Sequence, residues 1–156
     1  RNEFLVGSML LGNFHLKIEV KLVDNKGNSG VQFRSKPLPN GSVEGYQADI
    51  GVGWWGKLYE EHGRALLWKQ SGEKHVKNGE WNTYEIKAKD DLVQTSINGQ
   101  PCVDLKDPKG ARQGIIAFQL HTATGKLKAD MMPTIPNGCH CSYMRCSGRS
   151  LCIVKP

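Results

Sequence analysis

Six polar side chains stand at every second position of three segments that each have the pattern of a short strand: Gln32 and Arg34, Gln47 and Asp49, and Gln119 and His121. Side chains two residues apart on a strand point to the same face, so each segment would present its pair together. Amides donate and accept hydrogen bonds, a guanidinium binds pairs of oxygens, and a carboxylate or an imidazole moves protons. A face of this kind suits a sugar, with its many hydroxyl groups, better than it suits an apolar core.

Aromatic and titratable residues that could serve the same site come from a glycine-rich loop and the segment after it, and Tyr46 precedes that loop: Tyr46, Trp54, Trp55, Tyr59, Glu60, Glu61 and His62. Aromatic rings could stack on the apolar face of a sugar ring, because they are flat and largely apolar. The carboxylates and His62 could act as bases or as ligands to a cation.

Each of these residues also has a structural interpretation. Arg34 and Asp49 would then form a cross-strand ion pair, and Trp54 and Trp55 would anchor their loop in the core. The segment 119–121 and the Glu-Glu-His turn would be ordinary solvated surface. The letters of residues 51–56 match G-x-G-x-x-G, but two tryptophans would obstruct a pyrophosphate and no clear helix follows, so we discount a dinucleotide site.

The elements that must position these residues are strands. In residues 13–23 five apolar residues alternate with polar ones, which is typical of a half-buried strand and not of a helix. Asn98-Gly99 between two β-prone runs predicts a hairpin, because both residues tolerate a positive φ. Further strands are expected at 31–35, 44–50, 81–89, 92–97, 101–105 and 114–121, whereas 57–69 is ambiguous, with a short strand expected at 65–69. The pattern predicts an all-β protein, an antiparallel β-sandwich or barrel.

The basic surplus of the chain is partly confined to its end. The net charge is +6, and residues 131–156 carry three of the 21 basic residues and none of the 15 acidic ones. The body therefore has a mixed-charge surface, and no nucleic-acid-binding motif accompanies the charge. No apolar run has the length of a membrane span. We predict one β-sandwich domain over residues 1–130 and an atypical tail over 131–156, with neither a nucleic-acid partner nor a membrane span.

The predicted tail contains four of the five cysteines: Cys139, Cys141, Cys146 and Cys152. Their spacing lacks the C-x2-C pairs of common zinc sites and favours disulfides or an unstructured segment, with three pairings open. The chain begins with Arg1 and not with Met, as it would after removal of an export signal or in a trimmed sequence. We expect a periplasmic or extracellular protein.

Six motifs in order give the chain a family resemblance: G-N-S-G-V-Q-F-R, G-Y-Q-A-D-I, W-W-G-K-L-Y, G-E-W-N-T-Y-E-I, I-N-G and I-A-F-Q-L-H. Over residues 3–128 it resembles the 3-keto-disaccharide hydrolase domain, formerly a bacterial-type domain of unknown function. The resemblance implies a concanavalin A-like jelly-roll sandwich, similar to laminarinases, and action on glycosides whose glucose ring carries a ketone at C3. That ketone acidifies the C2 proton, so a base could remove it and expel the C1 substituent, and hydration would complete a net hydrolysis.

The resemblance also implies roles for individual residues. His121 or Glu60 would be the base, and Asp49 would orient a partner or a metal. Arg34 would bind the ketone, with Gln47 and Gln119 on the same concave face. Tyr46, Trp54 and His62 complete the expected substrate contacts. Arg34 or a divalent metal would stabilise the enolate oxygen.

Other function classes stay open at this stage. A non-catalytic, lectin-like carbohydrate-binding module could use the same polar faces and aromatic rings, and an interaction domain with the tail as an appendage is a third reading. The E-x-D-x-x-E triplet of laminarinases is absent from the sequence, which argues against retaining hydrolysis of ordinary glucans through two carboxylates. The oligomeric state is left open.

Overall fold

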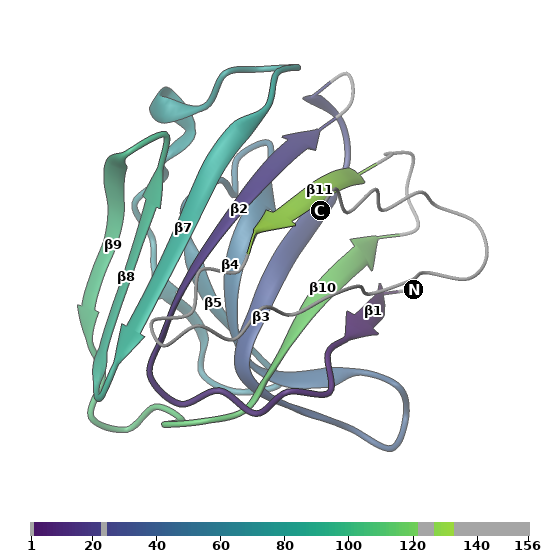
Figure 1. Cartoon of the computed structure of the whole chain (residues 1–156), viewed down its shortest axis with the longest axis vertical. Helices are drawn as coiled ribbons and strands as arrows, with labels where there is room; N and C mark the ends of the chain where they lie inside the picture. The colour runs from purple at the N-terminus through teal and green to yellow at the C-terminus, as the bar shows by residue number, and fades with distance from the viewer. Residues whose placement is uncertain (1, 23–24, 122–126, 133–156) are drawn as a thin grey trace.

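Two antiparallel sheets form the part of the chain that the computed structural model describes, residues 2–22, 25–121 and 127–132 (Figure 1). The six-stranded sheet has the order β1-β10-β3-β4-β5-β6, and the five-stranded sheet has the order β11-β2-β7-β8-β9. The strands of the first sheet are β1 (Asn2–Val6), β3 (Asn28–Pro37), β4 (Val43–Gly51), β5 (Leu58–Glu61), β6 (Ala65–Trp68) and β10 (Ile115–His121). Those of the second are β2 (Phe14–Leu22), β7 (Asn82–Lys89), β8 (Leu92–Ile97), β9 (Gln100–Lys106) and β11 (Leu127–Met132).

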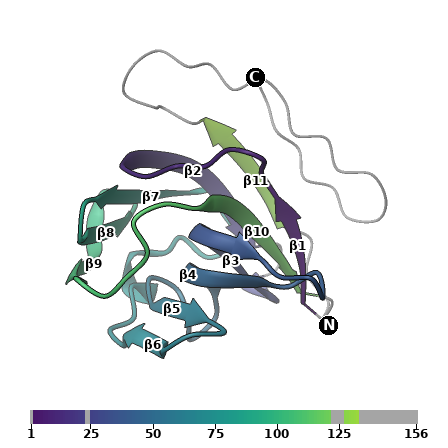
Figure 2. The same cartoon turned by 90° about the horizontal axis from the view of Figure 1, so that it is seen from below.

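The two sheets lie face to face as two layers, with the hydrophobic core between them (Figure 2). Strand β2 contributes every second residue to this core, from Phe14 to Leu22, as its alternation predicts. Val31, Phe33, Ala48 and Ile50 face it from β3 and β4. Because side chains alternate along a strand, the residues next to these four in β3 and β4 point away from the core. They lie on the other side of the six-stranded sheet, which we call its outer face.

The predicted antiparallel β-sandwich is confirmed, together with most of its strands. The hairpin of β8 and β9 turns at Asn98 and Gly99, whose φ angles are 51° and 77°. Strand β6 coincides to within one residue with the short strand expected at 65–69. The ambiguous segment before it contains strand β5. Strand β1 has no counterpart in the sequence-based prediction, since its five residues show no clean alternation.

No α-helix occurs in the described residues, and Glu73–His75 forms one turn of 3-10 helix. None of the described segments is a helix with the length and apolar character needed to cross a membrane. Strand β11 runs two residues past the predicted domain boundary at 130. The predictions for the four tail cysteines lie outside the described residues.

Candidate functional site

A set of buried polar side chains lies on the outer face of the six-stranded sheet: Gln32, Ser35, Gln47, Asp49 and Gln119. We call this set the amide network. They come from β3, β4 and β10, which are neighbours in the sheet. None of the five side chains is more than 4% exposed. The structure thus brings together Gln47, Asp49 and Gln119, as expected from their alternation in the sequence.

The hydrogen bonds of the amide network run in one direction. Ser35 Oγ donates to Gln32 Oε1 (3.0 Å), and Gln32 Nε2 donates to Gln47 Oε1 (2.6 Å). Gln47 Nε2 then donates to Asp49 Oδ1 (2.8 Å) and to Gln119 Oε1 (3.3 Å). The chain therefore ends at the carboxyl group of Asp49.

The Asp49 carboxyl is buried but only partly satisfied. Its Oδ2 is buried and accepts no hydrogen bond. The pKa of Asp49 is raised to about 7, mainly by burial and further by the negative charge of Glu61. The hydrogen bond from Gln47 and the positive charge of Lys57 oppose this rise. Near neutral pH this group is therefore divided between its acid and carboxylate forms, which is the property required of a general acid or base.

Half-buried and exposed side chains border the network on the side of β5. Tyr59 is directly opposite Gln47 in the sheet, and the backbone N–H of Asp49 donates to the Lys57 carbonyl (3.1 Å). The ammonium of Lys57 lies 4.9 Å from the ring centroid of Trp54, and the rings of Trp54 and Tyr59 meet edge to face at 6.5 Å. Trp54 is 39% exposed, so an aromatic surface open to solvent lies beside Lys57 and Tyr59 at this border.

An apolar cluster lies next to the amide network on the same face. Val43, Ile115 and Ala117 are buried there, and Phe4 packs against them. Phe4 is directly opposite Gln119 in the pairing of β1 with β10. The outer face thus combines polar groups with an apolar flank, a combination common in small-molecule sites.

The structure corrects the position expected for Arg34. The register shifts between Phe33 and Lys36, and Arg34 adopts a φ of 48°, so it occupies an irregularity in the strand. The alternation slips by one residue there, and Ser35 takes the place on the outer face where Arg34 was expected. The Arg34 guanidinium donates instead to the carbonyls of Gly12 (2.9 Å), Asp90 (2.8 Å) and Ala111 (3.3 Å) and to Asn13 Oδ1 (3.2 Å), and so ties loops together.

Tyr46 also lies away from the expected site. It is 1% exposed, and its ring stacks on Phe33 in the core with centroids 5.2 Å apart. Tyr46 follows the core parity of β4, one residue before Gln47, so it cannot share the face of Gln47.

Glu60 is engaged in an ion-pair cluster and is not beside Asp49. Arg64 donates to both Glu60 oxygens, at 2.6 and 2.7 Å, and this pairing lowers the Glu60 pKa. The same guanidinium contacts both oxygens of Asp107, at 2.9 and 2.6 Å. Glu60 is opposite Tyr46 in the sheet, hence on the other face from Asp49; Glu61 takes the position facing outward.

The two histidines of the expected site stand differently. His62 is exposed in the turn after β5, where its Nε2 lies 2.8 Å from Ser42 Oγ. His121 is the last residue of β10, paired with Asn2 and two positions beyond Gln119. The side chain of His121 lies outside the described residues.

The described residues do not fit a metal ion. Among them, no group of three or more His, Cys, Asp or Glu side chains is placed to hold one. The Asp49 carboxyl has the ammonium of Lys57 nearby, which would compete with a bound cation. The reaction proposed below therefore uses no metal.

The sequence pattern of the 3-keto-alpha-glucoside-1,2-lyase-like domain matches residues 1–129. The chain belongs to this family. No curated protein sequence matches it.

Solved structures place the lyase-like domain among jelly-roll sandwiches. It is similar to a carbohydrate-binding module, CBM66, from Bacillus subtilis, with a TM-score of 0.63 and 16% identity over 81% of this chain and 78% of that one. A putative glycosyl hydrolase from Parabacteroides distasonis gives a TM-score of 0.61 and 19% identity over 81% and 79%. A tetrameric galectin from the sponge Cinachyrella sp. gives 0.55 and 13% over 85% and 96%. The predicted jelly-roll sandwich is therefore confirmed.

Two residues of the lyase-like domain, Ser35 and Lys57, belong to the candidate site although the sequence analysis did not select them for it. Ser35 gave no signal because the irregularity at Arg34 is invisible in the alternation. Lys57 could have been found, because it alternates with Tyr59 and Glu61 along the segment next to Gln47 and Asp49. The ambiguity of residues 57–69 hid that parity.

Proposed function

We propose that this lyase-like domain cleaves glycosides next to a glucose ring oxidised at C3, with Asp49 as the base. The observation that carries the proposal is the buried Asp49 carboxyl with its unpartnered Oδ2. The exposed ring of Trp54 lies against Lys57, whose charge acts on Asp49. The family's description as a 1,2-lyase names an elimination across C1 and C2, which requires a base at the C2 proton.

In the proposed reaction Asp49 Oδ2 takes the proton from C2, and the electron pair forms the double bond to C1 as the C1 oxygen substituent leaves. Addition of water to the resulting enone completes a net hydrolysis. A base with a pKa of about 7 is well suited to this step, since a large fraction of it is ionised at neutral pH and the carboxylate still holds a proton strongly. The ammonium of Lys57 supplies positive charge near the developing enolate.

Substrate access requires movement at the border of the network. Asp49 is 3% exposed, while Lys57, Tyr59 and Glu61 are half-buried and lie beside it. In the proposed complex Tyr59 and Glu61 swing away from the carboxyl while Lys57 stays near it, and the sugar ring takes the vacated place against Trp54. The apolar faces of the ring and of the indole would then be in contact.

Release of the aglycone from a 3-keto-glucoside tests the proposal. We expect turnover by the unmodified chain, with kcat/KM falling below pH 7 as Asp49 is protonated. Asp49→Asn should lower kcat by about 100-fold or more. The matched control is Asp104→Asn, a carboxyl on the five-stranded sheet, which should leave kcat unchanged. Full activity of Asp49→Asn would exclude Asp49 as the base, and loss of activity in His121→Ala alone would transfer that role to His121.

A second candidate function is carbohydrate binding without catalysis. The exposed Trp54 beside Tyr59 favours it, because an open aromatic surface suits stacking of a sugar ring. Binding of the 3-keto-glucoside with no aglycone release, and a loss of that binding in Trp54→Ala, would support the binding module over the enzyme.

A further inference from the structure

We propose that Ser35, Gln32 and Gln47 form a positioning relay, which holds Asp49 by its Oδ1 and keeps Oδ2 as its free oxygen. The inference rests on the proposed function for what the free oxygen is used for. The arrangement itself can be tested on the whole chain without any sugar.

The direction of the relay follows from what each group can donate. An ionised Asp49 carboxylate can only accept, so the Gln47 amide must turn its NH2 group toward it. The same NH2 group meets a second acceptor, Gln119 Oε1, which favours the same orientation. Gln47 Oε1 therefore faces Gln32 Nε2, and Gln32 Oε1 faces the hydroxyl of Ser35. Every amide in the relay has its oxygen and its nitrogen engaged.

Gly30 provides the space in which the relay ends. It is paired with Asp49 on one side and with Gln119 on the other. A Cβ at this position would lie 2.5 Å from Gln47 Cγ and 2.8 Å from its Nε2. The Gln47 side chain therefore lies over the backbone of Gly30, between its two acceptors, and any larger residue would push it away.

A network kept only for stability would not need to end in this way. A buried polar network is favourable when all its members are satisfied, and a carboxyl oxygen left without a partner is a cost. Here the hydrogen bonds from Gln32 to Gln47 and from Gln47 onward lead to Asp49, while one oxygen of that group is left open. The arrangement favours a defined orientation of one carboxyl group over maximal stability.

The charged and titratable groups facing Asp49 are few among the described residues. Lys57 and Glu61 approach from the side of β5, with opposite effects on its charge. Tyr84 of β7 donates its hydroxyl to the Asp49 carbonyl at 3.4 Å. From β3 and β10 the described groups of the network are neutral amides and a hydroxyl, so a change in the relay should be read directly at Asp49.

Titration of the Asp49 carboxyl by 13C NMR in the full chain is the test. Gln47→Met keeps the side-chain length and removes the donor, and it should raise the pKa of Asp49 by about one unit. Gln94→Met is the matched control, since Gln94 Nε2 donates to Asp104 Oδ1 at 3.0 Å on the other sheet, and it should leave Asp49 unchanged.

Two further variants separate a relay from a single pair. Ser35→Ala removes the far end and should shift Asp49 in the same direction by a smaller amount, with Ser96→Ala as its control. Gly30→Ala should displace Gln47 and reproduce the shift of Gln47→Met, whereas Gly12→Ala, whose Cβ would find no atom closer than 3.6 Å, should not.

An unchanged titration of Asp49 in a folded Gln47→Met, Gly30→Ala or Ser35→Ala variant would overturn the relay. The outcome is independent of the proposed function. A chain that shows these shifts but never releases an aglycone keeps the relay and loses the enzyme, and an active chain without the shifts does the reverse.

Discussion

Asp49 and Asp107 are two aspartates of similar burial in opposite electrostatic surroundings. They are 3% and 6% exposed. Asp49 is a residue of β4, and Asp107 is bound to β4 by the hydrogen bond from the Tyr46 hydroxyl. Hydrogen bonds from the Arg64 guanidinium lower the pKa of Asp107 to about 2, because their effect is larger than the opposing effect of burial. Burial with one neutral amide donor leaves the pKa of Asp49 at about 7.

The difference shows that the partner, and not burial alone, decides what a buried carboxyl does. Asp107 accepts from Arg64, from the Tyr46 hydroxyl (2.6 Å) and from the backbone of Lys109 (3.2 Å), so both its oxygens are occupied at every ordinary pH. Asp107 is therefore an anchor that links the end of β9 to the six-stranded sheet. Asp49 changes its protonation near neutral pH, as a group with a chemical task would.

The largest predicted effect is a pH-dependent stabilisation by Asp49→Asn. A rise from the ordinary value of 3.8 to about 7 corresponds to about 4 kcal/mol between the two protonation states. The folded state keeps the proton up to about pH 7, whereas the unfolded state loses it near pH 3.8. Stability from this group is therefore full below pH 3.8 and is lost as pH rises to 7. Urea unfolding at pH 8 should show the variant more stable by about 2–4 kcal/mol.

Asp107→Asn is the matched comparison, and its sign is reversed. The stabilisation by Asp107 is full above the ordinary pKa of 3.8 and is lost as pH falls toward 2, because the carboxyl stays ionised to a lower pH in the folded state than in the unfolded state. The variant should be less stable than the unmodified chain at pH 5 to 8, and the gap should close below pH 3. The same pH dependence in both variants would contradict the contrast drawn between the two sites.

Arg64→Met should give the next largest effect, a loss of about 2–3 kcal/mol at pH 7 measured by urea unfolding. The change removes the common partner of Glu60 and Asp107, which are 15% and 7% exposed at their side chains. The Arg64 side chain is 38% exposed, and solvent screening keeps the loss below that of a fully buried pair. A loss below 0.5 kcal/mol would mean that the cluster is ordinary surface.

The sequence was sufficient for the fold because its signals are local and repeated. The alternation from Phe14 to Leu22 determines which face of β2 is buried, and Asn98-Gly99 determines a hairpin. The short strands β1 and β5 escaped prediction because neither has a clean alternation of its own. Their place in the sheet is set by pairing with β10 and β4, which are distant in sequence or only partly patterned.

The candidate site was predictable wherever strict alternation holds. Gln47, Asp49 and Gln119 lie together as their spacing indicates. Arg34 was misplaced because one residue with positive φ shifts the parity of the strand, and no pattern in the sequence announces it. Glu60 was assigned to the site although the sequence did not show which face of its strand it occupies. Its partner Arg64 is four residues away, and their contact becomes evident only once the β5–β6 turn is known.

Tyr46→Phe should cost less, about 1 kcal/mol, by urea unfolding at pH 7. The change removes one donor to Asp107 and leaves the stacking on Phe33 intact. Arg64 still occupies both Asp107 oxygens, so the carboxylate is not left unpaired. The pKa of Asp107 should rise slightly, since one hydrogen bond to its charged form is gone. A loss as large as that of Arg64→Met would instead make the hydroxyl the main partner of Asp107.

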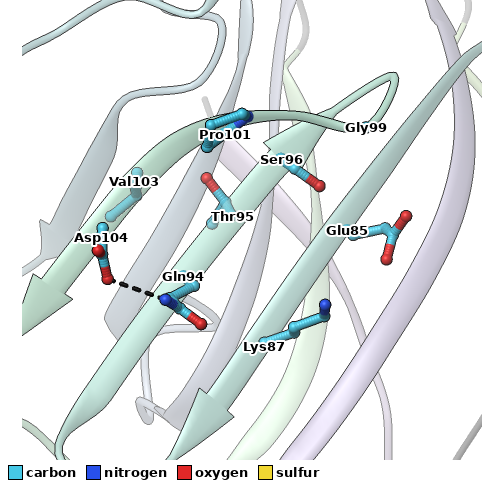
Figure 3. A pocket seen from close by; sticks show the side chains of 9 residues that line it. All are labelled: Glu85, Lys87, Gln94, Thr95, Ser96, Gly99, Pro101, Val103 and Asp104. Carbon is cyan, nitrogen blue, oxygen red and sulfur yellow. Dashed lines mark hydrogen bonds between the residues drawn. The ribbon is translucent and has the colours of Figure 1, made fainter.

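The smallest effect is expected on the outer surface of the five-stranded sheet, where the same two residue types meet in solvent. Gln94 Nε2 donates to Asp104 Oδ1 at 3.0 Å beside a shallow depression of about 260 Å³, also lined by Glu85, Lys87 and Ser96 (Figure 3). Water can replace that hydrogen bond, so Gln94→Ala should change the free energy of unfolding by less than about 0.5 kcal/mol at pH 5 and pH 8 alike. Gln47→Ala, which removes the corresponding donor to Asp49, should destabilise the chain more at pH 8 than at pH 5, because the carboxylate loses the hydrogen bond that favours its charged form. Equal pH dependence of the two variants in urea unfolding would mean that the buried pair behaves as the exposed one does.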